Sequence, residues 1–435
     1  MNQRSYGNNI GLIQELSILN DIQYHHERMF SYAAFLGHQP HISIAELHAV
    51  VPDLHMQRHL DSHWIIFESA MDIEQEVFRF WGGTIILAKQ ITTDDIVLED
   101  IPLLLANELR SGKGKVIFGL RTENIARKNI KKLYRDCKEH LRSKGRSSRY
   151  VGNERAPAAP VLLHDQEMIG NKSGCELVLL NEENHLWIGR TVAAHDPDDY
   201  GYRDMEKPVR DTRTGLMPPK LAQIMLNLGW WLCGRTKSGP PTILDPFCGT
   251  GVIPMEALLR SWPVIASDLS LRAVNGCTKN MDWFRKEEGI PKKDVPSAVF
   301  KHDARKPFDF SKIRDTDLRD GPDIIVTETS LGPPLEMRAA QRDALKHRTE
   351  NEKLQKEWLK NAMECLPDVP LVCTFPVWYL RTEPLFLEQI WKHLDNIGYK
   401  VIAPPGGQEN LHGRPTLLYR RPNQFVGREI VMLRP

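Results

Sequence analysis

The residues best suited to chemistry form a short loop between an apolar strand and a helix. This loop reads Asp245-Pro246-Phe247-Cys248-Gly249-Thr250-Gly251, and it joins the apolar run 242–244 to the helical stretch 253–260. Its glycines would let the backbone pass close to a ligand, and the free N–H groups at the start of the helix could hold polar ligand atoms. The pattern predicts a ligand site at this bend.

The loop also narrows the kind of ligand. A dinucleotide site calls for a third glycine at position 254, where the chain has Pro254. A phosphate-binding loop would end in Gly-Lys-Ser/Thr, and this ending is absent. Because Asp245 precedes the glycines, a cationic or zwitterionic ligand is favoured over a pyrophosphate.

Two further acids follow the next two predicted strands. Asp268 ends the apolar run 264–266, and Asp303 follows Val299-Phe300. Carboxyl ends of parallel strands meet at one edge of a sheet, so these acids should converge with Asp245. Asp268 is placed to accept both hydroxyls of a ribose, and Asp303 could accept an exocyclic adenine amine. Each acid taken alone could instead cap a helix.

A fourth strand end carries the candidate catalytic residue. The run Ile324-Ile325-Val326-Thr327 leads into Glu328-Thr329-Ser330-Leu331. An exocyclic base amine is a poor nucleophile, and a carboxylate together with a backbone carbonyl could accept its hydrogens and free its lone pair. Glu328 is therefore the predicted catalytic residue for methyl transfer to such an amine. The alternative is an ordinary carboxylate at a strand end.

Charge is distributed very unevenly along the chain. The 435 residues carry a formal net charge of +1, yet positions 110–149 hold fourteen Lys or Arg and only three acids, a net of +11. Most of the basic residues lie off the apolar stripe of a predicted helix, Asn124 to Lys144. Such a face is either simply solvated or the binding surface for a polyanion. Its candidate RNA-binding residues are Arg127, Lys128, Lys131, Lys132, Arg135, Arg146 and Arg149.

The order of predicted elements indicates an α/β protein with at least two cores. Up to about residue 194, β-like runs alternate with helical stretches in an α+β pattern. From Leu216 onward, strands and helices alternate as in a mostly parallel, helix-covered sheet. Seven scattered cysteines offer no zinc spacing, so no metal is expected, and free thiols fit a reducing compartment. With no apolar targeting or membrane-spanning run in the sequence, the expected location is the cytoplasm.

Several of these motifs occur together in a known family. The loop 245–251 followed by Glu256-Ala257 resembles the cofactor loop of the THUMP-domain RNA methyltransferases. The runs 188–192, 202–208 and 218–222 extend the resemblance to the branch that methylates guanosine N2 at position 10 of tRNA. The resemblance covers nearly the whole chain from about Phe30.

The family implies a fold and a set of domains. They are an N-terminal extension (1–29), a ferredoxin-like unit (30–105), a THUMP-like RNA-binding domain (106–194), a linker with a docking helix (195–240), and a Rossmann-like domain (241–435) that binds S-adenosylmethionine (SAM). In the wider class of amino-methyltransferases the catalytic run is Asp or Asn, two prolines and an aromatic residue. The corresponding run here, Glu328-Thr329-Ser330-Leu331, lacks both prolines and the aromatic ring. Carried over by position, the cofactor-binding residues are Asp245, Phe247, Gly249, Thr250, Gly251, Asp268, Asp303 and Ala304.

The resemblance implies tRNA as the partner, no membrane, and a small accessory protein of the kind that some relatives need. Two other functions stay open at this point. An adenine-N6 DNA methylase would share the SAM loop, although it normally carries the proline-containing catalytic run. A catalytically degenerate RNA-binding protein would explain why the run at Glu328 is atypical.

Overall fold

The computed structural model describes residues 29–57, 63–110, 114–170, 174–182, 185–211, 217–234, 239–332, 339–381, 383–407, 410, 412–422 and 424–435. The predicted extension falls outside these residues except for Met29. The described chain forms two compact units. One, the sheet unit, holds residues 29–40 and 51–201. The other, the cleft unit, holds residues 41–50 and 202–435.

The sheet unit is built on eight strands in the order β2-β3-β1-β4-β8-β7-β5-β6. The strands are β1 (Phe30–Leu36), β2 (His55–Met56), β3 (Trp64–Ser69), β4 (Thr84–Thr92), β5 (Val116–Glu123), β6 (Ser148–Val151), β7 (Gly174–Glu182) and β8 (His185–Ala194). The helices are α3 (Gln75–Phe78), α4 (Ile101–Glu108), α5 (Arg127–Ser143), α6 (Pro160–Asp165) and α7 (Pro197–Gly201). One continuous sheet thus runs through both 30–105 and 106–194.

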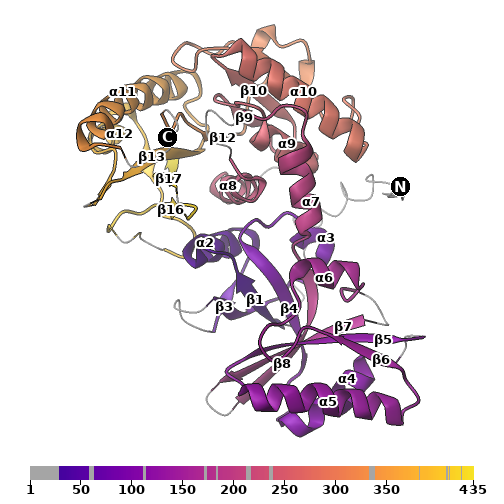
Figure 1. Cartoon of the computed structure of the whole chain (residues 1–435). Helices are drawn as coiled ribbons and strands as arrows, with labels where there is room; N and C mark the ends of the chain where they lie inside the picture. The colour runs from indigo at the N-terminus through magenta and orange to yellow at the C-terminus, as the bar shows by residue number, and fades with distance from the viewer. Residues whose placement is uncertain are drawn as a thin grey trace. The chain divides into compact units, whose positions relative to one another are not determined.

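The long basic helix of the sequence is α5. Its apolar residues Ile130, Leu133, Tyr134, Cys137 and Leu141 are buried, as their helical spacing predicts. They pack with residues of α4 and with β5 and β7, and Figure 1 shows α4 and α5 together on one side of this sheet. Gly145, at φ 72°, follows the helix end, which confirms the predicted stop. The opposite face of α5 is left to solvent.

The cleft unit contains a Rossmann-like sheet, in agreement with the prediction. Its main strand order is β11-β10-β9-β12-β13-β17-β15, with β14 beside β13 and β16 beside β17. The strands are β9 (Ile243–Asp245), β10 (Val264–Asp268), β11 (Ser297–Lys301), β12 (Ile324–Glu328), β13 (Leu371–Tyr379), β14 (Pro384–Leu385), β15 (Lys400–Val401), β16 (Leu417–Tyr419) and β17 (Val426–Arg434). Strands β9 to β13 are parallel, and β17 runs antiparallel to β13.

Helices cover both faces of this sheet, which explains why its strands are apolar on both sides. Ile243 packs in one core with residues of α8, α9 and α10, whereas its neighbour Leu244 packs in a second core with residues of α11 and α12. The helices are α8 (Pro219–Leu232), α9 (Val252–Leu259), α10 (Leu271–Glu288), α11 (Gln341–Cys365) and α12 (Gln389–Ile397). Figure 1 shows α11 and α12 as a pair beside β13. No described helix meets both the length and the hydropathy needed to cross a membrane.

The division into units differs from the predicted domains in two places. Helix α2 (Pro40–Val50) lies early in the chain but belongs to the cleft unit. Its Glu46 is fully buried and accepts a hydrogen bond from Asn227 of α8 at 2.7 Å, and His41 contacts the carbonyl of Leu418 in β16 at 3.0 Å. The second difference is the boundary, which falls after Gly201 and so leaves α7 in the sheet unit.

A buried ion pair joins the segment after Gly201 to α9, the helix that follows the glycine loop. Arg203 and Glu256 are both fully buried, and the Arg203 Nε lies 2.9 Å from a Glu256 carboxylate oxygen. An isolated charge in such a place would be costly, so each residue depends on the other. This contact explains why the 202–208 run and Glu256, which are far apart in the chain, belong to one structural unit.

Candidate functional site

A cleft of about 480 Å³ opens at the carboxyl ends of β9, β10 and β12. Strand β9 lies between β10 and β12, so the chain reverses its direction of travel across the sheet there, and open α/β sheets bind ligands at such a switch point. We call it the switch-point cleft. The predicted site residues that line it are Asp245, Phe247, Gly249, Thr250, Asp268, Asp303, Ala304 and Glu328.

Glycine is required at both predicted positions of the loop between β9 and α9. Gly249 has φ 51° and Gly251 has φ 89°, a region that other residues rarely adopt. A side chain on Gly251 would also place its Cβ 2.7 Å from Cys277 Sγ. Gly251 is the N-cap of α9, so it shapes the bend while Gly249 and Thr250 line the cleft.

Asp245 is a buried carboxylate at the base of the cleft. It accepts hydrogen bonds from the Thr327 hydroxyl at 2.6 Å and the Phe247 N–H at 3.2 Å. Burial raises the pKa of Asp245 to about 7, because its two hydrogen bonds offset only part of the lost hydration. Near neutral pH the group is therefore poised between charged and neutral forms. A cationic ligand in the cleft would favour the charged form.

Asp268 supports the loop as well as facing the cleft. One of its oxygens accepts the Gly249 N–H at 3.1 Å, and the other accepts the Ser270 N–H at 2.8 Å. A carboxylate has about four acceptor sites, so both oxygens can still accept hydroxyl groups. The arrangement is compatible with the predicted ribose contact.

Asp303 has a partner that the sequence analysis missed. Arg305 grips both of its oxygens, with Nε and Nη2 each at 2.9 Å. These hydrogen bonds, chiefly, hold the pKa of Asp303 below its usual value. Arg305 follows Asp303 by two positions, and this spacing is the feature of the sequence that could have predicted the pair. An adenine amine would have to share this carboxylate with Arg305.

Glu328, the candidate catalytic residue, ends β12 and lines the cleft. The backbone after it is held by α11. Thr329 donates its hydroxyl hydrogen to the Thr374 carbonyl and accepts from Gln355, and Asn351 donates to the Ser330 carbonyl at 2.6 Å. These contacts fix the loop backbone, and they leave the Glu328 side chain to face the cleft.

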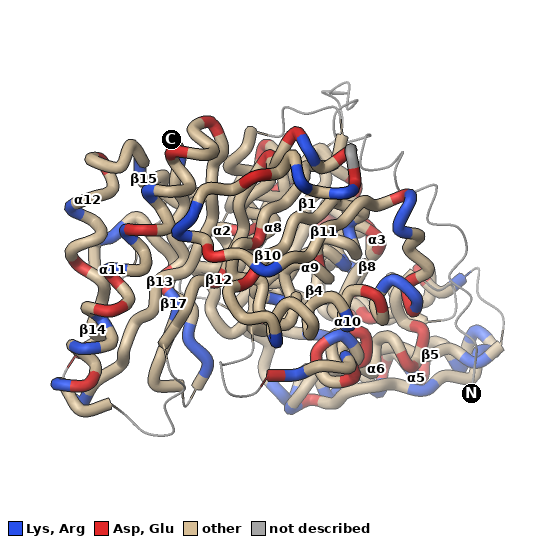
Figure 2. Tube along the Cα trace, turned by 90° about the horizontal axis from the view of Figure 1, so that it is seen from above, with Lys and Arg blue, Asp and Glu red and all other residues tan. Residues whose placement is uncertain are grey.

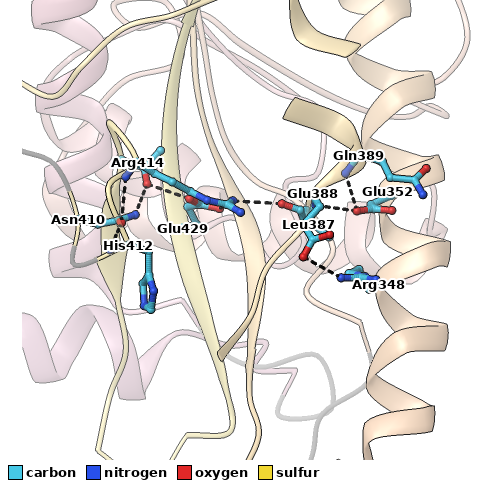
Figure 3. Close-up of polar contacts among 10 residues, drawn as sticks. Arg348, Glu352, Leu387, Glu388, Gln389, Asn410, His412, Arg414 and Glu429 are labelled. Atoms are coloured by element: carbon cyan, nitrogen blue, oxygen red, sulfur yellow. Dashed lines mark hydrogen bonds and ion pairs between the residues drawn. The ribbon is translucent and has the colours of Figure 1, made fainter. Parts of the chain in front are cut away.

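Helix α11 continues this polar support toward the next loop (Figure 3). Glu352 accepts the backbone N–H groups of Glu388 and Gln389 at 2.7 and 2.9 Å. Across the adjacent strands, Arg414 lies 3.3 Å from the fully buried Glu429. Burial raises the pKa of Glu429 to about 7, against the opposing effects of Arg414 and Thr416. One side of α11 thus braces the backbone that follows β12 and the start of α12.

The predicted RNA-binding residues lie in the sheet unit. Arg127, Lys128, Lys131, Lys132 and Arg135 are exposed along α5, where blue segments recur in Figure 2, and Arg149 is exposed on β6. Arg146 differs from them: it donates to the Leu109 carbonyl at 3.1 Å, and its Nε and Nη2 are buried. Arg146 therefore ties the end of α5 to α4 and does not present its guanidinium at the surface.

Two further observations concern metal ligands and cysteines. Within the described residues, no group of three or more His, Cys, Asp or Glu side chains could hold a metal ion. All seven cysteines are free thiols. The strand order and the cleft define a Rossmann-like α/β unit with a cleft at its switch point.

Comparisons with known proteins bear on the identity of such a unit. No protein-family model matches the chain. A tRNA (guanine(10)-N2)-dimethyltransferase of Methanothermobacter thermautotrophicus is 33% identical over 175 residues, which are 40% of this chain and 43% of that protein. A protein of the same name from Methanocaldococcus jannaschii is 32% identical over 102 residues, 23% of this chain and 27% of the relative. The chain therefore matches less than half the length of these relatives.

Solved structures give weaker similarities. TrmN from Thermus thermophilus aligns with a TM-score of 0.48 and 15% identity over 94% of this chain and 99% of its own. A possible methylase from Clostridium difficile 630 aligns with a TM-score of 0.41 and 11% identity over the same shares.

Proposed function

We propose that the chain is a SAM-dependent methyltransferase that modifies tRNA, at guanosine N2 of position 10. The observation that carries the proposal is the switch-point cleft, where three strand-end aspartates and the two-glycine bend meet beside Glu328. The sequence similarity to two tRNA (guanine(10)-N2)-dimethyltransferases supports the choice of substrate.

Each part of the cleft has a task under this proposal. SAM supplies an electrophilic methyl group when it is bound. The carboxylate of Asp245 offsets the positive charge of the cofactor, and Asp268 accepts its ribose hydroxyls. Glu328 accepts a hydrogen bond from the exocyclic amine, which makes the nitrogen lone pair available for attack, and it takes up the proton that the methylated nitrogen releases. The hydrogen bonds at Thr329 and Ser330 fix the backbone next to Glu328, and positioning supplies a large share of such rate accelerations.

The braced loop argues against a decayed active site. Thr329, Gln355 and Trp358 are buried and joined by hydrogen bonds, including one of 2.6 Å from Trp358 to Gln355. A buried polar network of this kind is unstable unless its members are satisfied, so a site without a function would be expected to lose it.

Transfer of labelled methyl from SAM to total tRNA, and separately to duplex DNA, tests the proposal directly. We expect label in tRNA and none in DNA, and mass spectrometry of the digested tRNA should locate N2-methylguanosine. Label in DNA alone would favour an adenine methylase. Tight binding of tRNA with no transfer to either substrate would favour a non-catalytic RNA-binding protein.

We further propose that the exposed residues of α5 contact RNA phosphates. Lys128 and Lys131 lie on the exposed side of the helix, and they are separated by three positions, so they point in similar directions. Lysine at a phosphate contact releases a counterion, which makes binding depend on salt.

Reversing both charges, Lys128→Glu with Lys131→Glu, should weaken tRNA binding roughly tenfold or more at 50 mM salt. The slope of log affinity against log salt should become shallower by about two, one for each lost contact. Filter binding across a salt series measures both quantities, and calorimetry should find SAM affinity unchanged.

A matched control reverses two exposed lysines on α11, Lys353 and Lys360, which face solvent in the other unit. The control should keep the parental salt slope. Equal losses in the two double variants would mean that α5 contributes only general charge, and its role as an interface would be rejected.

A further inference from the structure

The carboxylate of Glu328 has a buried cationic partner. Arg428 of β17 donates from its Nε to Glu328 Oε1. The Arg428 side chain is 2% exposed and that of Glu328 is 15% exposed, and of the two only Glu328 lines the cleft. The guanidinium carbon of Arg428 also lies 5.7 Å from the ring centre of Tyr419. The cation is held from two sides.

Sheet topology creates this pair, because the two residues lie a hundred positions apart in the chain. Glu328 is paired with Thr374 of β13, and Pro376, two positions further along β13, is paired with Arg428. Tyr419 of β16 is in turn paired with Arg428. The antiparallel last strand thus brings a fixed positive charge to the candidate catalytic carboxylate.

A carboxylate in this setting recognises one pattern of hydrogen-bond donors. An ionised carboxylate only accepts hydrogen bonds, through two oxygens that lie side by side. Guanine offers a matching edge, because its N1–H and one hydrogen of its 2-amino group are adjacent donors. Adenine offers a donor at N6 beside an acceptor at N1, so one carboxylate oxygen would face a lone pair. A side-chain amide has the opposite preference, since it carries one acceptor and one donor.

We propose that the Glu328–Arg428 couple selects guanine, with Glu328 contacting N1–H and the 2-amino group and Arg428 acting as its positioning residue. This inference rests on the proposed function and goes beyond it to the basis of base choice. The planar guanidinium donates its Nε–H to the carboxylate from a fixed direction, whereas the ammonium of lysine can rotate and fixes the carboxylate orientation less well. Leu331, which has no aromatic ring, lines the cleft close to Glu328 in the chain, so under this proposal the base is recognised through its edge.

Base analogues at the methylated nucleotide test this proposal. 2-Aminopurine keeps the 2-amino group but has an acceptor at N1, and hypoxanthine keeps N1–H but lacks the amine. We expect kcat/KM for 2-aminopurine RNA to fall roughly 10- to 100-fold below that for guanine RNA, the effect of losing one hydrogen bond to a charged group. Hypoxanthine RNA should accept no methyl but should still compete. Equal rates for guanine and 2-aminopurine would overturn the proposal.

Variants show whether a change in rate comes from the Glu328 side chain or from the intrinsic reactivity of the analogue. In Glu328→Gln the ratio of guanine to 2-aminopurine rates should approach one, and the preference for guanine over adenine should narrow. Arg428→Met should raise KM for the guanine RNA and lose the discrimination between guanine and 2-aminopurine, while its SAM affinity stays unchanged. Arg428→Lys should recover part of this discrimination. Full discrimination in Arg428→Met would remove Arg428 from base selection.

The outcome distinguishes failure of this inference from failure of the proposed function. If the parental protein methylates no guanine in tRNA, the proposed function itself is wrong. If it methylates guanine but treats the analogues and the variants alike, only the role of the Glu328–Arg428 couple is wrong.

Discussion

Replacing Asp245 by Asn should abolish measurable SAM binding while making the folded protein more stable above pH 7. The two effects have one cause. The buried carboxylate is the group that would offset the positive charge of SAM, and the same burial penalises its charged form. Asn keeps an oxygen that can accept from Thr327 and Phe247, but it carries no charge.

The pH dependence follows from the direction of the shift. The pKa of Asp245 is about 7 in the folded chain and 3.8 as its ordinary value, so the folded state binds the proton more tightly. Stability is therefore lost as pH rises between these values, by an amount on the order of 4 kcal/mol. The melting temperature of Asp245→Asn relative to the parental protein should rise across this interval and level off above pH 7.

Calorimetric titration with SAM at pH 6, 7 and 8 provides the second measurement. The parental affinity should increase with pH through about 7, because the bound cation requires the carboxylate form. Asp309→Asn is the control, since Asp309 is an exposed carboxylate in the same unit that pairs with Lys312. Unchanged SAM binding in Asp245→Asn would exclude Asp245 from the cofactor site.

The strands of the cleft could be predicted because local sequence determines them. Asp245 and Asp268 each follow a short apolar run, and the parallel sheet brings such strand ends to one edge whatever the details of packing. Glycine at 249 and 251 likewise reflects a backbone requirement that is visible in a single sequence. The Rossmann-like sheet and the positions of these residues were therefore predicted correctly.

The partners of those residues were harder to predict, because they depend on three-dimensional packing. Arg428 meets Glu328 only because β17 runs antiparallel beside β13, and no spacing in the sequence encodes that contact. Arg146 belongs to a basic run, but its side chain turns inward to the end of α4. Helix α2 packs in the cleft unit, although most residues of that unit follow about 150 positions later in the chain. Composition predicts the presence of such charges, and only packing decides which ones reach solvent.

Replacing Glu328 by Ala should reduce turnover by about 10² to 10⁴, the usual contribution of a group that accepts a proton in the transition state. SAM affinity should stay at the parental value, since the proposed cofactor contacts follow β9, β10 and β11. Single-turnover methyl transfer under saturating SAM and tRNA measures the chemical step.

The same substitution should destabilise the fold, and this effect must be separated from catalysis. Removing the carboxylate leaves Arg428 buried without its partner, which costs about 3–5 kcal/mol in comparable pairs. Replacing both residues, Glu328→Ala with Arg428→Met, removes the uncompensated charge, and such exchanges are often neutral or stabilising. The double variant should therefore recover its melting temperature.

Recovery of stability without recovery of turnover would assign the loss of rate to the carboxylate itself. An unfolded fraction would lower the apparent rate of Glu328→Ala even if the carboxylate had no role in chemistry, so the two effects must be measured separately. If the double variant regains both its melting temperature and its turnover, then the ion pair serves the fold alone. In that case the hydrogen acceptor for the amine has to be sought among the backbone carbonyls of the braced loop.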